Sequence, residues 1–347
     1  MKTWGFYLLL VLFPILWLAC NNDSDDATAE NTPSLNIVSQ DSSYLVNLTN
    51  FEIDKSKACE WTIDGIPVSI QKINDTQYKF ASSLVKAGKH NLTLFHNEQR
   101  ISGSIYKIIS LHYKVVKTVP HRSDLFTEGF FFDAEDNLWE SSGLDGKSKI
   151  FKMRWNGSRW QILDSLNEAP EEFGEGISLL NGELVHLYWK NQYLKTFSLN
   201  PLKNTNTIPF EGEGWGLCSA GSDALWVSNG SSQLKKIQLK GNQLLTLKTI
   251  NVSNDIGPIT NLNELEEMDE KFVWANVWQS DHIVLIDQEN GTVLGDLDLS
   301  TLGQQERSSS FNAEVLNGIA YHKKDNTLWI TGKYWKNIYI LELTNLP

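Results

Sequence analysis

Short segments in which apolar and polar residues alternate run through residues 34–104. They have the period of two that is typical of half-buried β-strands, with turn signals such as Asp64–Gly65 between them, and they cover residues 44–48, 59–63, 78–80 and 91–95. About seventy residues of this kind suit a small β-sandwich of the immunoglobulin-like type, with Trp61 in its core. Nothing in this stretch suggests catalysis, so we interpret it as a spacer or docking domain.

From residue 105 onward the pattern becomes an internal repeat. Five segments share a start marked by Gly or Asn, an apolar strand, a turn and a second strand, and their starts lie roughly 40–55 residues apart. This spacing is typical of four-stranded propeller blades, which bury their apolar faces by stacking around a channel. The sequence therefore predicts an all-β protein: a five-bladed β-propeller over 105–347, preceded by the immunoglobulin-like β-sandwich. We expect the strand after Tyr106 to complete the last blade by pairing with the C-terminal strand.

The repeat predicts which side chains meet. The first strand of each blade lines a propeller's channel, so polar and aromatic residues at the repeat starts converge near the axis: Glu128, Glu175, Trp215, Asn263 and Asn317. Three more residues follow the second strands: Trp189, Trp278 and Lys333. A carboxylate among aromatic rings, near an amide and a lysine, favours a binding site over simple packing. Four other tryptophans lie inside second strands and are expected in the core: Trp139, Trp226, Trp274 and Trp329. Three further acidic residues are expected in a polar loop or along the channel: Glu264, Glu266 and Glu267.

Charge and metal-ligand content narrow the possible functions. The chain has 30 Lys+Arg against 42 Asp+Glu and a net charge of −12, which argues against a nucleic-acid partner. Neither the three cysteines nor the seven histidines have the spacing of zinc ligands, so we expect no metal site and no cofactor. Cys59 and Cys218 are expected to pack as small apolar side chains.

The N-terminus has the pattern of an export signal. Lys2 precedes an apolar run over residues 4–19, which ends at Cys20 and gives way to an acidic, polar stretch. We predict a lipoprotein signal peptide over 1–20, lipidation of Cys20 and a flexible acidic tether over 21–33. The protein would then be exported and anchored to the membrane of a bacterial cell envelope, facing the periplasm or the cell surface. Lipoprotein signal peptides usually have Leu three residues before the lipidated cysteine, and this chain has Trp17 there. A plain secretory signal therefore remains the alternative.

Ten motifs give the second half of the chain a family resemblance. Their order and spacing over residues 110–347 resemble those of the plant-type and bacterial glutaminyl-peptide cyclotransferases: FTEG, ESSGLDGKS, FGEG, YWKN, GEGWGL, SNGSS, NLNELE, ANVWQSD, LNGIAY and TGKYW. The resemblance implies conversion of the N-terminal glutamine of peptides or proteins to pyroglutamate with release of ammonia. It requires no metal, and we expect a monomer.

The resemblance also implies roles for individual residues. Glu175 corresponds to the catalytic glutamate, which we expect to take a proton from the substrate amine and return it to the departing nitrogen. The pocket aromatics correspond to Phe126, Phe173, Trp189, Trp215 and Trp278. Asn263 and Lys333 correspond to polar substrate contacts that stabilise the oxyanion. Glu128 departs from the family, which usually has Gln there; its charge would lie beside the substrate ammonium or raise the pKa of Glu175.

Two other function classes remain open at this point. The protein could be a non-catalytic propeller that binds peptide or glycan at the cell surface, with Glu128 marking a lost activity. It could also be a propeller hydrolase of the lactone or sugar type. Such a hydrolase needs several Asp, Glu or His metal ligands in the channel, and the repeat starts supply no His.

Overall fold

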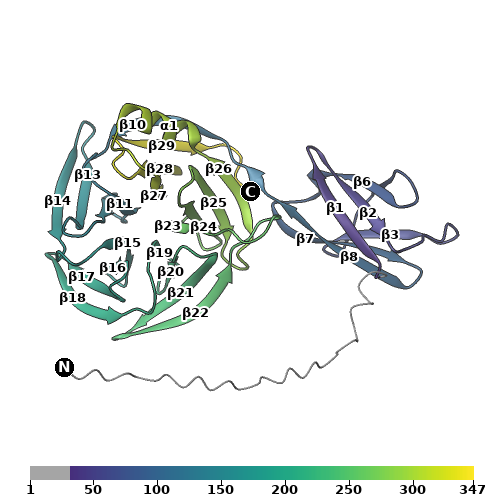
Figure 1. Ribbon diagram of the computed structural model, residues 1–347, viewed down its shortest axis with the longest axis horizontal. Helices are drawn as coiled ribbons and strands as arrows, with labels where there is room; N and C mark the ends of the chain where they lie inside the picture. The colour runs from purple at the N-terminus through teal and green to yellow at the C-terminus, as the bar shows by residue number, and fades with distance from the viewer. Residues whose placement is uncertain (1–31) are drawn as a thin grey trace, which may run out of the picture.

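The computed structural model describes residues 32–347, which form a ring of sheets and a smaller N-terminal unit beside it (Figure 1). The chain is all-β, as predicted, and its described part has one α-helix, α1 (Ser300–Ser309). No helix in that part has the length and apolarity of a membrane span. The predicted signal peptide, Cys20 and most of the predicted tether lie outside the described residues.

The N-terminal unit consists of two four-stranded sheets, with strand orders β1-β2-β6-β5 and β4-β3-β7-β8. Its elements are β1 (Ser34–Gln40), β2 (Ser43–Thr49), β3 (Cys59–Ile63), β4 (Ile66–Pro67), β5 (Gln71–Lys72), β6 (Gln77–Ala81), the 3-10 helix η1 (Ser82–Leu84), β7 (Gly88–His96) and β8 (Gln99–Lys107). Their alternating apolar residues meet in one core that contains Trp61, Leu92 and Leu94. All four strand segments predicted from the alternation form, and Trp61 is buried as expected.

The ring contains five antiparallel sheets. Along the chain, the first three are β11 (Thr127–Phe132), β12 (Leu138–Ser142), β13 (Lys149–Trp155) and β14 (Trp160–Asn167); β15 (Gly174–Leu180), β16 (Glu183–Tyr188), β17 (Tyr193–Leu199) and β18 (Leu202–Pro209); and β19 (Leu217–Ser219), β20 (Leu225–Val227), β21 (Gln233–Lys240) and β22 (Gln243–Asn251). The last two are β23 (Leu262–Glu267), β24 (Phe272–Val277), β25 (His282–Asp287) and β26 (Val293–Asp298); and β27 (Leu316–His322), β28 (Thr327–Gly332), β29 (Asn337–Leu343) and β10 (Tyr113–Pro120). The first strands contact one another in the order β11, β15, β19, β23, β27 and back to β11, so the arrangement is propeller-like and closed.

Two segments from the start of the ring secure its closure. Strand β10 pairs antiparallel with β29, Tyr113 opposite Leu343, which confirms that the strand after Tyr106 completes the last sheet. The short strand β9 (Ile109–Ser110) pairs parallel with β26 and joins the linker from the N-terminal unit to the fourth sheet. The ring therefore leaves no first or last sheet incomplete.

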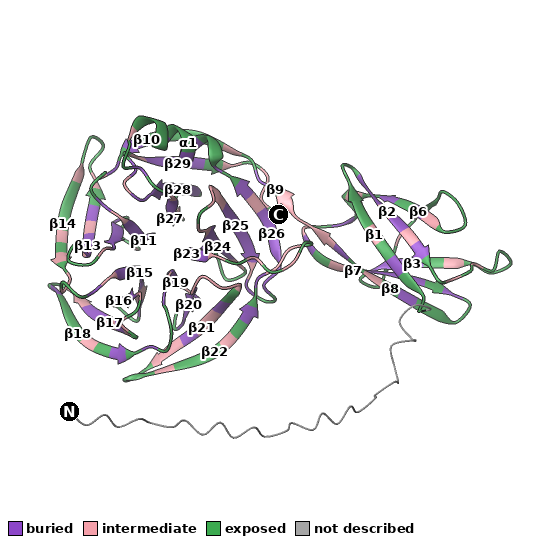
Figure 2. Ribbon diagram, in the orientation of Figure 1, coloured by how far each residue is buried: buried purple, intermediate pink, exposed green. Residues whose placement is uncertain are grey.

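Apolar side chains fill the spaces between neighbouring sheets. Figure 2 shows the inner strands mostly buried and the outer strands β14, β18 and β22 largely exposed, whereas β26, beside the N-terminal unit, is mostly buried. Trp139, Trp226, Trp274 and Trp329 are all buried, as their positions inside second strands predicted. The indole of Trp139 donates to Asp133 Oδ2 at 2.9 Å and that of Trp226 to Gln288 Oε1 at 2.7 Å, so these two large rings are buried without losing their hydrogen bonds.

Glycines at the repeat starts allow the inner strands to approach closely. A Cβ on Gly176 would lie 2.4 Å from Leu217 N, and one on Gly216 would lie 2.0 Å from Asn263 O. Both distances are shorter than any carbon contact tolerates, so no other residue fits without moving the backbone. The Gly-marked starts of the repeat thus reflect backbone packing at the axis.

β-Bulges at these same starts set the direction of the polar side chains. In four of the five sheets, the pairing of the first strand with the second shifts register near the beginning of the first strand. A bulge interrupts the alternation of a strand and re-aims a side chain. The first residue within each of these shifts is Glu128, Glu175, Asn263 or Asn317.

Candidate active site

The nine residues predicted for the site all line one cavity of about 420 Å³. They come from the starts of first strands and from positions directly after second strands, so the cavity lies at one end of the ring's axis. The nine are Phe126, Glu128, Phe173, Glu175, Trp189, Trp215, Asn263, Trp278 and Lys333. The structure thus brings together every residue of the predicted site, whereas Asn317, which the repeat also placed near the axis, does not line the cavity.

Glu175 lies on β15 and is only 6% exposed. Its backbone is fixed from both sides, because Ser141 Oγ donates to its carbonyl oxygen at 2.5 Å and the next amide, Gly176 N, donates to Trp215 O at 2.8 Å. No described side chain forms a hydrogen bond or ion pair with its carboxyl group. Burial raises the pKa of Glu175 well above its ordinary value, and the charge of Glu128 raises it further. A carboxyl held in this way is suited to exchanging protons near neutral pH.

Glu128 is the centre of a buried polar cluster. Lys333 Nζ lies 2.6 Å from its Oε1, and Asn317 Nδ2 donates to its Oε2 at 3.0 Å. The Lys333 ammonium also lies 4.2 Å from the centroid of the Phe126 ring. Burial raises the pKa of Glu128 to about 7, although Lys333 opposes the shift. Lys333 was expected to contact the substrate; the structure buries it at the cavity wall and pairs it with Glu128, the residue that departs from the motif of the resembled family.

The five aromatic residues are half-buried and form two groups on the cavity wall. Phe173 packs edge-on against Phe126 at 6.2 Å and against Trp189 at 5.4 Å, measured between ring centroids. Trp215 and Trp278 form the second group, 5.5 Å apart at 80°. A single carboxylate connects the groups, because Glu213 Oε2 accepts from the indoles of Trp189 at 3.0 Å and Trp215 at 3.2 Å. Glu213 was not among the residues predicted for the site, and no pattern in the sequence indicates that it joins the two groups of rings.

Asn263 supplies an unused hydrogen-bond acceptor. Its side-chain oxygen is buried and has no partner among the described residues, whereas its backbone oxygen accepts from Ser228 Oγ at 2.7 Å. A buried acceptor without a donor is costly unless a ligand or water satisfies it. The cavity can therefore hold a ligand N–H group at this wall.

Sequence reasoning missed the loop residues of the cavity: Leu144, Gln279, Glu314 and Val315. Two of them have left-handed backbone conformations, with φ of 85° at Leu144 and 65° at Gln279. Tyr334, whose ring lies 5.4 Å from that of Phe126, has φ of 60°. Loop residues carry no periodic signal, so a pattern-based analysis could not place them.

Glu264, Glu266 and Glu267 lie in the inner strand β23 and are buried, so of the two expectations the polar loop is wrong and the position along the channel agrees with the structure. Glu264 Oε1 accepts from the backbone N–H of Phe130 at 2.8 Å, and Glu266 Oε1 from that of Tyr321 at 2.8 Å. Because β23 and β11 are not neighbours in the ring, the Glu264 side chain bridges its interior. Within residues 32–347, no group of three or more His, Cys, Asp or Glu could hold a metal ion. Cys218 is buried and Cys59 half-buried, and both are free thiols.

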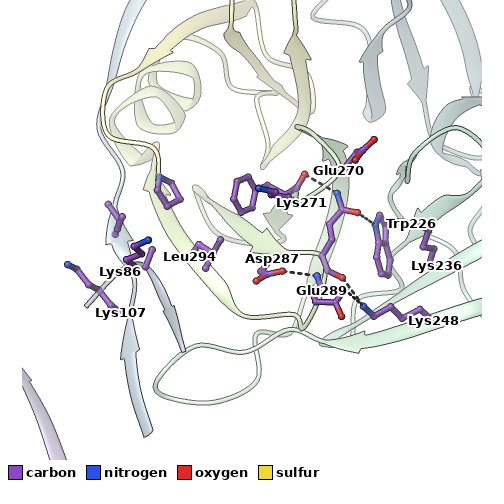
Figure 3. Close-up of a pocket in the computed structure, with 15 residues that line it drawn as sticks. Lys86, Lys107, Trp226, Lys236, Lys248, Glu270, Lys271, Asp287, Glu289 and Leu294 are labelled. Atoms are coloured by element: carbon purple, nitrogen blue, oxygen red, sulfur yellow. Dashed lines mark hydrogen bonds and ion pairs between the residues drawn. The ribbon is translucent and has the colours of Figure 1, made fainter. Parts of the chain in front are cut away.

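A second cavity, of about 920 Å³, lies where the N-terminal unit meets the ring (Figure 3). Its lining includes Lys86 and Lys107 from the N-terminal unit and Lys248 and Glu289 from the ring. Lys248 and Glu289 form an ion pair at 3.1 Å. None of the nine predicted residues lines it, so the candidate chemistry is confined to the axial cavity.

Comparison with known proteins identifies the family. The sequence model of a family described as glutamine cyclotransferase matches residues 90–343. The chain belongs to this family. It is 34% identical over 234 residues to a glutaminyl-peptide cyclotransferase of Arabidopsis thaliana. The aligned region covers 66% of this chain and 71% of the relative. The crystal structure of Myxococcus xanthus glutaminyl cyclase matches with a TM-score of 0.61 and 26% identity, over 70% of this chain and 100% of that one. The family resemblance seen in the sequence is thus confirmed.

Stability should depend on the ion pair at the cyclotransferase cavity. The raised folded-state pKa of Glu128 means that its contribution to stability is full below the unfolded-state pKa and is lost as pH rises through about 7. Lys333→Met removes the cation, so we expect a loss of about 3–5 kcal/mol in the free energy of unfolding at pH 8 and a smaller loss at pH 5. Urea unfolding of the wild type and Lys333→Met at both pH values measures this difference in the free energy of unfolding.

The matched control is Glu128→Gln, which introduces the residue usual in the family. The double variant Glu128→Gln/Lys333→Met should recover most of the stability that Lys333→Met loses, because no buried charge is left unpaired. An equal loss in the single and double variants would contradict the assignment of the ion pair.

Proposed function

We propose that this chain converts N-terminal glutamine of peptides or proteins to pyroglutamate, with Glu175 as the general acid and base. The observation that carries the proposal is the buried Glu175 carboxyl, to which no described residue donates a hydrogen bond, in a cavity walled by aromatic rings. Family membership supports the reaction class. The reaction is an acyl transfer within the substrate, and the enzyme would belong to the aminoacyltransferases.

The step balances with one proton relay. Starting from the neutral α-amine, the nitrogen attacks the side-chain carboxamide carbon, and a new C–N bond closes the five-membered lactam. The attacking nitrogen loses one proton, and the departing NH₂ gains one and leaves as ammonia. Glu175 accepts the first proton and donates the second, so the enzyme returns to its starting state. Such acid–base assistance is worth about 10²–10⁴-fold in rate.

The walls of the cavity supply the remaining requirements. The Trp and Phe rings can hold the methylene groups of glutamine and exclude water, which keeps the amine close to the carboxamide carbon. The free side-chain oxygen of Asn263 can accept an N–H of the substrate, while Lys333 and the Asn263 amide contribute to stabilising the developing oxyanion. No metal or cofactor takes part in this mechanism.

The proposed architecture gives this site a rigid support. We infer that the five sheets are the blades of a five-bladed β-propeller, that the N-terminal unit is an immunoglobulin-like sandwich over 34–104, and that the protein is a monomer. The unbroken sequence of contacts between inner strands and the pairing of β10 with β29 support a closed five-blade ring. The two facing sheets around Trp61 support the sandwich.

Replacing Glu175 tests the proposal directly. Glu175→Gln keeps the shape of the side chain and removes its titration, so ammonia release from Gln-Ala should fall about 10²–10⁴-fold while the variant still binds the dipeptide. Since Glu175 must be ionised to act as a base and its pKa is raised, kcat/KM of the wild type should still increase with pH well above the ordinary glutamate pKa. A chelator should leave the wild-type rate unchanged.

Ser178→Ala, on the same strand at the opposite end of the ring, is the matched control and should keep wild-type turnover. If the wild type binds the dipeptide and releases no ammonia, the protein is a binding propeller and the proposed activity is wrong. If Glu175→Gln retains full turnover, the role of Glu175 is wrong.

We further propose that the chain is an exported lipoprotein anchored through Cys20. The apolar run that ends at this cysteine and the acidic residues after it support the proposal. Growth with labelled palmitate should label the wild type and not Cys20→Ser; label in both would contradict it.

A further inference from the structure

A second groove adjoins the catalytic cavity. It has a volume of about 780 Å³, and it shares three lining residues with the cavity: Phe126, Leu144 and Glu314. Its remaining walls come from the loops between β10 and β11 and between β12 and β13, from the loop after α1 and from Tyr334. The two spaces therefore adjoin at the shared residues, on the side where a chain that starts in the cavity would leave it.

The groove carries a net positive charge. Lys147 is exposed and Lys149 half-buried, and neither forms an ion pair with any described residue. The acidic Asp124 on the same wall is already paired, because Arg122 donates to both of its oxygens at 2.7 and 3.2 Å. Glu314, at the boundary with the cavity, is the other carboxylate among the described lining residues, so the two ammonium groups exceed the remaining negative charge by one and favour a negatively charged ligand.

The loop after α1 adds an apolar contact. Phe311 lies on the lining of the groove and is fully exposed, at 103%. The ring is free to contact a ligand, and aromatic rings are enriched in binding surfaces. Asn312, beside it, supplies a polar group to the same wall.

We propose that this groove is the subsite for the substrate residues that follow the N-terminal glutamine, and that it selects acidic peptides or acidic protein N-termini. The proposal rests on the proposed function. The glutamine occupies the axial cavity, the chain leaves over Phe126 and Leu144, and carboxylates at the next positions pair with Lys147 and Lys149. Phe311 packs against the departing chain, so peptides longer than two residues gain contacts that a dipeptide lacks.

The test compares Gln-initiated peptides at low ionic strength. The tetrapeptide Gln-Ala-Asp-Asp should have a higher kcat/KM than Gln-Ala-Ala-Ala, and Gln-Ala-Lys-Lys a lower one, with the dipeptide Gln-Ala as the internal reference. Two exposed ion pairs correspond to about a 3–10-fold preference. The ratio of the acidic tetrapeptide rate to the dipeptide rate should fall by this factor in Lys147→Ala/Lys149→Ala. Phe311→Ala should lower the same ratio for all three tetrapeptides.

The control Lys203→Ala/Lys240→Ala removes the same charge from exposed positions on β18 and β21, and should leave the ratio unchanged. If Gln-Ala is turned over and the tetrapeptides show no preference by charge or length, the subsite is wrong and the proposed function stands. If Gln-Ala is not turned over, the proposed function falls. In that case calorimetry tests the groove separately, by comparing the binding of Gln-Ala-Asp-Asp to Glu175→Gln with its binding to Glu175→Gln/Lys147→Ala/Lys149→Ala. Weaker binding without the two lysines supports the subsite, and equal binding overturns it.

Discussion

The close approach of the inner strands at the axis is the constraint on which the rest of this structure depends. The backbones of neighbouring sheets come so near that Gly176 and Gly216 leave no space for a Cβ. The bulges beside these contacts interrupt the strand alternation and bring polar side chains to one end of the ring. Carboxyl and amide groups from distant parts of the chain are thereby buried together, where their environment is set by the backbone and not by flexible loops.

Burial at this position changes the chemistry of the carboxyl groups. Among the described residues that line the catalytic cavity, Lys333 is the only basic one, and Glu128 already holds it at 2.6 Å. Glu175 is left in the same low-dielectric space without a cation of its own, which keeps its pKa high and its proton exchangeable. The two glutamates therefore differ in role. The Glu128 carboxyl is paired with the Lys333 ammonium, whereas the Glu175 carboxyl has no such partner and transfers a proton.

The repeat in the sequence was sufficient for most of the fold and for the residues at the strand starts. Glu128, Glu175 and Asn263 could be predicted because each follows a fixed position in a repeating unit, and the core tryptophans because they lie inside second strands. The loops could not be predicted in this way. Leu144 and Glu314 line the cavity through backbone conformations that leave no periodic trace, and the pairing of Lys333 with Glu128 depends on a distance across the ring. For the three glutamates of β23 the sequence left a loop and the channel open, because an acidic run is ordinarily a solvent-exposed segment; here backbone N–H groups from other parts of the ring donate to their oxygens.

The most direct test of this account is the titration of the Glu175 carboxyl group itself. Carbon-13 NMR of protein labelled at the glutamate side-chain carboxyl carbon, with Glu175→Gln used to assign the signal, reports its protonation at each pH. The account predicts a resonance that titrates well above the ordinary glutamate range and is absent from the variant. A Glu175 signal that titrates at the ordinary value would mean that the axial cavity does not shift this carboxyl, and it would contradict the proton relay.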